Sequence, residues 1–196
     1  MALEINTSPD YGDKDPKKDL DLEKIGEMIG KLPELNYDKY YQELSATGIY
    51  LDDDPTAVGL NSLNMKIAQI DSQKTRIGYV LTLAIQHEND IESTCKFINR
   101  VYDKKRASFL GSVSIKELGN QNLREAAVER EFAILLDVKN DMEISLMKAK
   151  SFTKTVQQVF NALDSTNKNI SRQLTAIQTM VEIGEISRTT TTFKNE

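Results

Sequence analysis

The residues best suited to chemistry lie between positions 96 and 130, where cations gather around an aromatic ring. This stretch holds eight Lys and Arg against four Asp and Glu, a net charge of +4 in a chain whose total is −5. Cations bind the phosphates of a nucleic-acid backbone and a ring stacks on the bases, so this combination suits single strands of any sequence. The candidate nucleic-acid-binding residues are Arg100, Lys104, Lys105, Arg106, Phe109, Lys116 and Arg124.

A purely structural explanation of the same residues stays open. Cations near the C-terminus of a helix are stabilised by the helix dipole, whatever else they do. Glu125 can pair with arginines of its own helix, and together with Asn122 it fits a capping box that begins a helix. The basic stretch is therefore either a binding surface or a charged bend between two helices.

The rest of the chain offers no catalytic arrangement. It lacks the GxxxxGK[ST] motif that binds phosphates, and no nucleophile is spaced to work with His87, which we interpret as a surface histidine on a helix. Cys95 falls on an apolar stripe and is interpreted as a small core residue. One Cys and one His cannot form a Cys/His metal site, and the acidic run at 52–54 is interpreted as a solvated linker. We therefore expect no enzyme, no metal and no cofactor.

Two long helices are expected to position the basic stretch. Apolar residues recur at alternating spacings of four and three, the heptad pattern of coiled coils, over about 60–106 and again over about 123–183. Because neither Gly nor Pro occurs from 120 to 183, the second helix is predicted to be uninterrupted. The first heptad stripe is Leu63, Ile67, Ile70, Lys74, Ile77, Leu81, Ala84, Glu88, Ile91, Cys95, Ile98 and Tyr102. The second is Leu135, Val138, Met142, Ser145, Ala149, Phe152, Val156, Val159, Leu163, Thr166, Ile170, Gln173, Ile177 and Met180.

Two such helices must fold back on each other, because a straight continuation would leave both apolar stripes in water. The predicted fold is all-α, a long antiparallel helical hairpin of coiled-coil type with two short N-terminal helices. We expect a flexible N-terminal arm over 1–18, the short helices and an acidic linker over 19–59, the hairpin over 60–185 and a flexible tail over 186–196. A two-helix hairpin buries one stripe per helix, so a homo-oligomer is expected.

Composition and charge restrict the cellular setting. No apolar run reaches the length of a signal peptide or a membrane span, which favours a cytoplasmic protein without membrane contact. Residues 1–59 hold 6 Lys against 14 acidic residues, a net charge of −8, so the remaining residues carry a net charge of +3. An acidic N-terminal part is therefore joined to a basic bend.

Three segments resemble the UvsY-type recombination mediators of bacteriophages. The segment IGKLPELNYDKYYQEL resembles the family's early helix, in which a Pro-x-Leu-x-x-x-Tyr-like motif precedes the first long helix. The basic and aromatic residues at the end of the first long helix resemble the family's basic turn, although the family's Tyr-Tyr-x-Gly signature is absent. LREAAVEREFAILLD and the following helix through NISRQLTAIQTM resemble the family's C-terminal assembly helix.

The resemblance implies an all-helical homo-oligomer that binds single-stranded DNA and helps a recombinase displace the single-strand-binding protein. Arg100, Lys104, Lys105 and Arg106 would then match the family's basic cluster. The protein would act in the cytoplasm, which is the host cytoplasm if the protein is viral. The alternative is a structural coiled-coil protein, such as a virion component, scaffold or tether, that has no affinity for nucleic acid.

Overall fold

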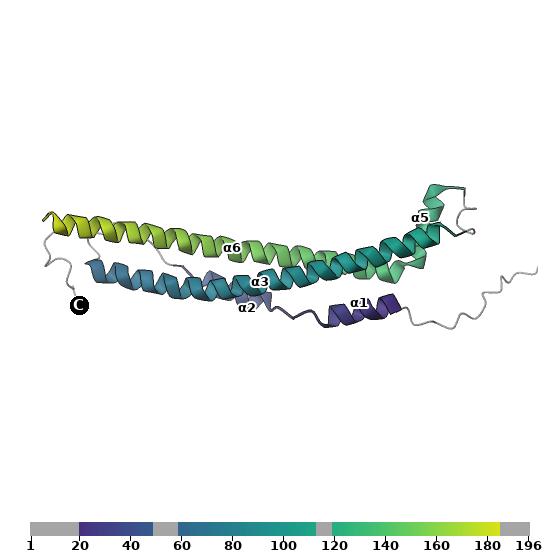
Figure 1. Cartoon of the computed structure of the whole chain (residues 1–196), viewed down its shortest axis with the longest axis horizontal. Helices are drawn as coiled ribbons and strands as arrows, with labels where there is room; N and C mark the ends of the chain where they lie inside the picture. The colour runs from purple at the N-terminus through teal and green to yellow at the C-terminus, as the bar shows by residue number, and fades with distance from the viewer. Residues whose placement is uncertain (1–19, 49–58, 113–118, 185–196) are drawn as a thin grey trace, which may run out of the picture. The chain divides into compact units, whose positions relative to one another are not determined.

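The computed structural model describes residues 20–48, 59–112 and 119–184 and shows an all-α fold (Figure 1). No strand occurs in these three ranges, so the predicted fold class is confirmed. The expected arm at 1–18, the acidic run at 52–54 and the expected tail at 186–196 lie outside the described residues. The helices, labelled as in Figure 1, are α1 (Leu20–Gly30), α2 (Tyr37–Ser45), α3 (Gly59–Leu110), α5 (Gln121–Glu131) and α6 (Ala133–Glu182).

The chain divides into two compact units. Unit 1 comprises Met1–Leu32 and Thr94–Asn140, and unit 2 comprises Pro33–Ser93 and Asp141–Glu196. Helix α3 contributes its N-terminal part to unit 2 and its C-terminal part to unit 1. The basic stretch singled out above belongs entirely to unit 1.

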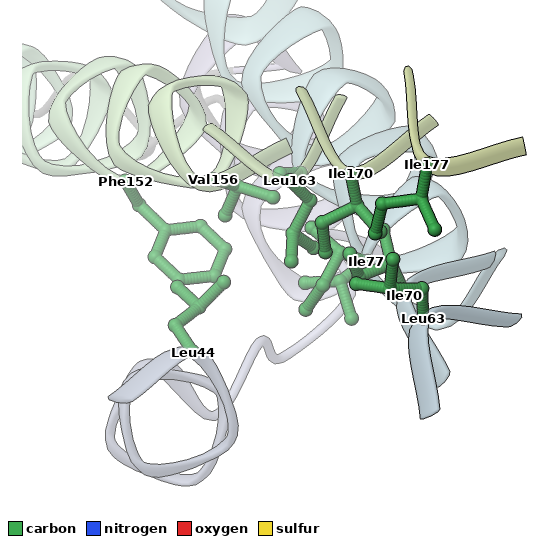
Figure 2. Packing of buried hydrophobic residues seen from close by; sticks show 11 residues of the cluster. Leu44, Leu63, Ile70, Ile77, Phe152, Val156, Leu163, Ile170 and Ile177 are labelled. Atoms are coloured by element: carbon green, nitrogen blue, oxygen red, sulfur yellow. The ribbon is translucent and has the colours of Figure 1, made fainter. Parts of the chain in front are cut away.

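Unit 2 contains the predicted antiparallel hairpin of α3 and α6. The Nζ of Lys74 lies 2.6 Å from a carboxylate oxygen of Asp164, and Asn167 donates to Asp71 at 2.9 Å, so residue numbers rise on one helix as they fall on the other. The seam between the helices is apolar, as the heptads predict (Figure 2). Its fully buried members include Leu63, Ile70, Ile77, Val156 and Ile170.

Helix α2 packs on this hairpin through aromatic rings. Figure 2 shows the Phe152 ring of α6 pointing toward Leu44 of α2. The rings of Tyr37 and Tyr41 meet Phe152 edge to face, with centroids 4.9 Å and 5.3 Å away. Asn36 caps the helix, because its side chain accepts a hydrogen bond from the Lys39 amide at 3.0 Å. A short, polar helix is thus held in place by burial of a few large side chains.

The prediction of an uninterrupted second long helix is wrong. The chain turns at Phe132, between α5 and α6, where φ is −111° and ψ is 24°. The Phe132 amide still donates to Val128 and its carbonyl still accepts from Leu136, both at 2.9 Å. Backbone hydrogen bonding therefore continues through the bend. No Gly or Pro causes the bend, which instead coincides with packing of the Phe132 ring against α3.

The start of α5 also differs from the sequence expectation. Asn120 is the N-cap, and its side chain accepts a hydrogen bond from the Asn122 amide at 2.9 Å. The capping box expected for Asn122 and Glu125 is therefore wrong. The helix begins two residues earlier than expected, because Asn120 caps its N-terminus in place of Asn122.

Candidate nucleic-acid interface

Two of the predicted DNA contacts, Arg100 and Lys104, are exposed on the C-terminal part of α3 in unit 1. They are four residues apart, so they lie on the same side of the helix one turn from each other. Across the three described ranges, neither side chain forms an ion pair or hydrogen bond with another residue. These two cations are available to a phosphate backbone.

The next two cations of the cluster pair with carboxylates from other helices. Lys105 lies 3.9 Å from Asp21 of α1, and Arg106 donates to Glu125 of α5 at 2.5 Å. This hydrogen bond to the Glu125 carboxylate is the main cause that raises the pKa of Arg106. Glu125 thus reaches across to α3, whereas the sequence suggested pairing along its own helix. Part of the +4 net charge of the stretch is compensated within unit 1.

The aromatic ring expected to stack on bases is occupied. Phe109 is half-buried, and its ring meets Phe132 edge to face with centroids 5.5 Å apart. The Tyr102 ring also meets the Phe132 ring edge to face, with centroids 6.5 Å apart. Of the other predicted contacts, Arg124 is half-buried and already engaged in an interaction, and Lys116 lies outside the described residues.

Sequence reasoning overlooked Phe97, an aromatic residue next to the exposed cations. It lies three residues before Arg100 and seven before Lys104, so the three share one side of α3. The ring is half-buried, with the Nζ of Lys24 of α1 5.1 Å from its centroid. The spacing of three and four residues from Phe97 to Arg100 and Lys104 would have identified it. Phe109 was chosen because it follows the basic residues in the chain.

The interpretation of His87 as a surface residue is wrong. Its side chain belongs to unit 2, is only 8% exposed and lies with its ring centroid 6.0 Å from that of Tyr37. Its Nδ1 is buried and has no hydrogen-bond partner among the described residues. Burial lowers the pKa of His87, and the nearby carboxylate of Asp90 opposes that shift. Cys95, by contrast, is buried as expected.

Two other kinds of site are absent from the described ranges. No group of three or more His, Cys, Asp or Glu residues there lies close enough to hold a metal ion. No helix within those ranges has the length and apolar character needed to cross a membrane. No protein-family model, curated protein or solved structure matches this chain.

Proposed function

We propose that this chain is a phage-type recombination mediator that binds single-stranded DNA as a homo-oligomer and assists recombinase loading. The supporting observation is the pair Arg100 and Lys104, two exposed cations on one side of α3 that form no ion pair with another described residue. The recombinase and the single-strand-binding protein enter as partners through the resemblance to UvsY-type proteins. The site of action is then the host cytoplasm.

The affinity of one copy for DNA should be low. Affinity from phosphate contacts grows with the number of counterions released, and two cations release few. Several copies that bind one strand together multiply the effect, because each further contact becomes intramolecular. The proposal therefore requires an oligomer.

Exposed apolar residues of α6 support self-association. Ile144 and Met147 lie three residues apart and are 48% and 67% exposed. Side chains of this kind on one side of a helix favour burial against another apolar surface. A second copy of the chain would supply such a surface.

Fluorescence anisotropy with labelled poly-dT tests the proposal at about 50 mM and about 200 mM salt. We expect binding by the wild-type chain to fall steeply between the two. The double variant Arg100→Glu, Lys104→Glu should bind at least about tenfold more weakly. Its matched control is Lys150→Glu, Lys154→Glu, which reverses two exposed cations at the same spacing on α6. Failure of the wild-type chain to bind at low salt, or equal losses in both variants, would refute DNA binding through α3.

A structural coiled-coil protein is the second candidate, and the internal partners of the basic stretch favour it. Lys105 and Arg106 pair with Asp21 and Glu125, and Phe109 packs on Phe132, as expected for a charged bend with no ligand. This candidate predicts the same oligomer with no affinity for DNA. The mass in solution with and without poly-dT separates the two, since only a mediator would gain the mass of the strand.

A further inference from the structure

Helix α1 covers part of the side of α3 that carries the exposed cations. Its Ile25 side chain is 2% exposed, Lys24 lies over the Phe97 ring and Asp21 pairs with Lys105. Both helices belong to unit 1. The acidic N-terminal part of the chain therefore contacts the basic stretch directly.

The covered and the exposed residues are continuous on α3. Phe97, Arg100 and Lys104 follow one another at spacings of three and four, so they share one side of the helix, and Lys105 lies about 100° round the helix from Lys104. Arg100 and Lys104 are exposed, while Phe97 and Lys105 both contact α1. Removal of α1 would expose the Phe97 ring and a third cation, Lys105, in addition to the two cations already exposed.

We propose that α1 is a displaceable cover, and that Phe97, Arg100, Lys104 and Lys105 form the complete face of α3 that binds single-stranded DNA. This inference rests on the proposed function and adds its regulation and its stacking residue. The strand and α1 are both anionic and contact the same side chains. They compete, and each weakens the binding of the other by the same factor.

The docking of α1 is weak enough for such competition. Helices shorter than about 12 residues are marginal in water without packing, and α1 has 11. Ile25 is the one α1 residue that is buried among those whose side chains are described. The Asp21–Lys105 pair is long at 3.9 Å and its Asp21 side chain is 48% exposed, so it adds little.

The chemistry of α1 matches that of its competitor. It carries three acidic residues and one lysine, so it presents negative charge to the cations of α3 as a phosphate backbone would. A strand can replace Asp21 with a phosphate at Lys105 and replace Lys24 with a base on Phe97. Phe109 offers no such exchange, because Phe132 of the same packed bend covers it.

The first test is Ile25→Ser, which removes the apolar anchor of α1 without changing the net charge. Undocking raises the fraction of chains that are competent to bind, so we expect labelled poly-dT to bind about fivefold more tightly at low salt. The control is Ile183→Ser, the same substitution at a residue 62% exposed in unit 2, which should leave affinity unchanged. Circular dichroism checks that both variants remain helical.

The stacking role of Phe97 is tested in the Ile25→Ser background. Phe97→Leu keeps an apolar side chain but removes the ring, and we expect it to reverse most of the gain in affinity. Phe109→Leu in the same background makes the same chemical change at the covered ring and should leave the gain intact. Equal effects of the two substitutions would overturn the assignment of Phe97.

Two further measurements complete the test without removing the apolar anchor Ile25. Addition of poly-dT to the wild-type chain should accelerate amide hydrogen exchange in residues 20–30. Asp21→Asn should tighten binding about twofold, whereas Glu27→Gln, the same charge change at an exposed residue that pairs with Lys31, should not. If the wild-type chain binds and none of these effects appears, α1 is no cover and the proposed function stands. If no variant binds DNA, both fail.

Discussion

Both parts of α3 combine buried apolar residues with ion pairs to other helices, and they differ in the proportion of the two. In unit 2 its buried residues join those of α6 and α2 in one contiguous apolar cluster (Figure 2). In unit 1 its Lys105 and Arg106 pair with carboxylates of α1 and α5, and its rings Tyr102 and Phe109 both contact Phe132. Apolar packing resists opening, whereas partly exposed ion pairs exchange readily with other anions. On our proposal that α1 is displaceable, the same helix provides a scaffold in unit 2 and an exchangeable surface in unit 1.

The largest effect is expected from a charge placed in the seam of unit 2. Ile77→Asp buries a carboxylate at a position with 0% exposure, and we expect a loss of about 4 kcal/mol or more in the free energy of unfolding. Ile85→Asp, on the same helix at 43% exposure, should cost about 1 kcal/mol or less. Urea denaturation followed by circular dichroism measures both. Similar losses would mean that the seam does not stabilise the fold.

Removal of one ring from each unit sharpens the comparison. Phe152→Ala empties a site that is 1% exposed and that anchors α2, so it should cost about 3–5 kcal/mol. Phe132→Ala removes a half-buried ring in unit 1 and should cost about 1–2 kcal/mol, with the loss of exchange protection confined to α5 and the adjoining turns. Denaturation and amide exchange of the two variants test this order. The reverse order would show that unit 1 is the more tightly packed.

The hairpin was predictable because heptad spacing reports directly which side of a helix is buried. Every residue of the two predicted stripes is buried or half-buried, including the polar ones. Lys74 shows how a cation fits such a seam, since its ammonium nitrogen lies 5.8 Å from the centroid of the Phe160 ring and 2.6 Å from a carboxylate oxygen of Asp164. The local spacing of apolar residues was therefore sufficient to predict burial wherever one helix packs along another.

The bend and the partners of the basic stretch were not predictable in this way. The turn at Phe132 involves rings some 23 to 30 positions earlier, and the pairing of Lys105 with Asp21 joins residues 84 apart. His87 was misread because its burial depends on Tyr37 of α2 and not on its own helix. Contacts between distant segments leave no periodic signal.

The pH dependence of unit 2 gives a smaller effect than either ring removal. The pKa of His87 is lowered in the folded chain by burial, so the folded state holds a neutral ring where the unfolded state takes up a proton. The stabilisation is present above the ordinary pKa of 6.5 and declines as pH falls below it. Tyr37 of α2 and Asp90 of α3 are the titratable groups known to face the ring, and Phe152 of α6 contacts Tyr37 without a charge.

We therefore expect the wild-type chain to lose stability between about pH 7.5 and about pH 5.5, and His87→Phe to lose less over the same interval. Urea denaturation at constant salt gives the slope of unfolding free energy against pH for both chains. Any pH-independent loss of stability caused by the larger Phe ring cancels when the two slopes are compared. Asp90→Asn should steepen the wild-type slope, because it removes the charge that favours protonation. An unchanged slope in His87→Phe would assign the pH dependence to other groups.

The smallest effect is expected at Asp164, where unit 2 has an electrostatic contact of its own. Hydrogen bonds from Lys168 and Lys74 lower the pKa of this carboxyl from 3.8 to about 2. The folded state thus holds the charged form more strongly than the unfolded chain, so the stabilisation is complete above pH 3.8 and is lost as pH falls through about 2. Asp164→Asn should flatten the acid limb of the stability curve in that interval and change little at neutral pH. Asp141→Asn, at an exposed position of the same helix, is the control and should leave the limb unchanged. A large loss at neutral pH in Asp164→Asn would mean that ion pairing, and not the apolar seam, holds α3 against α6.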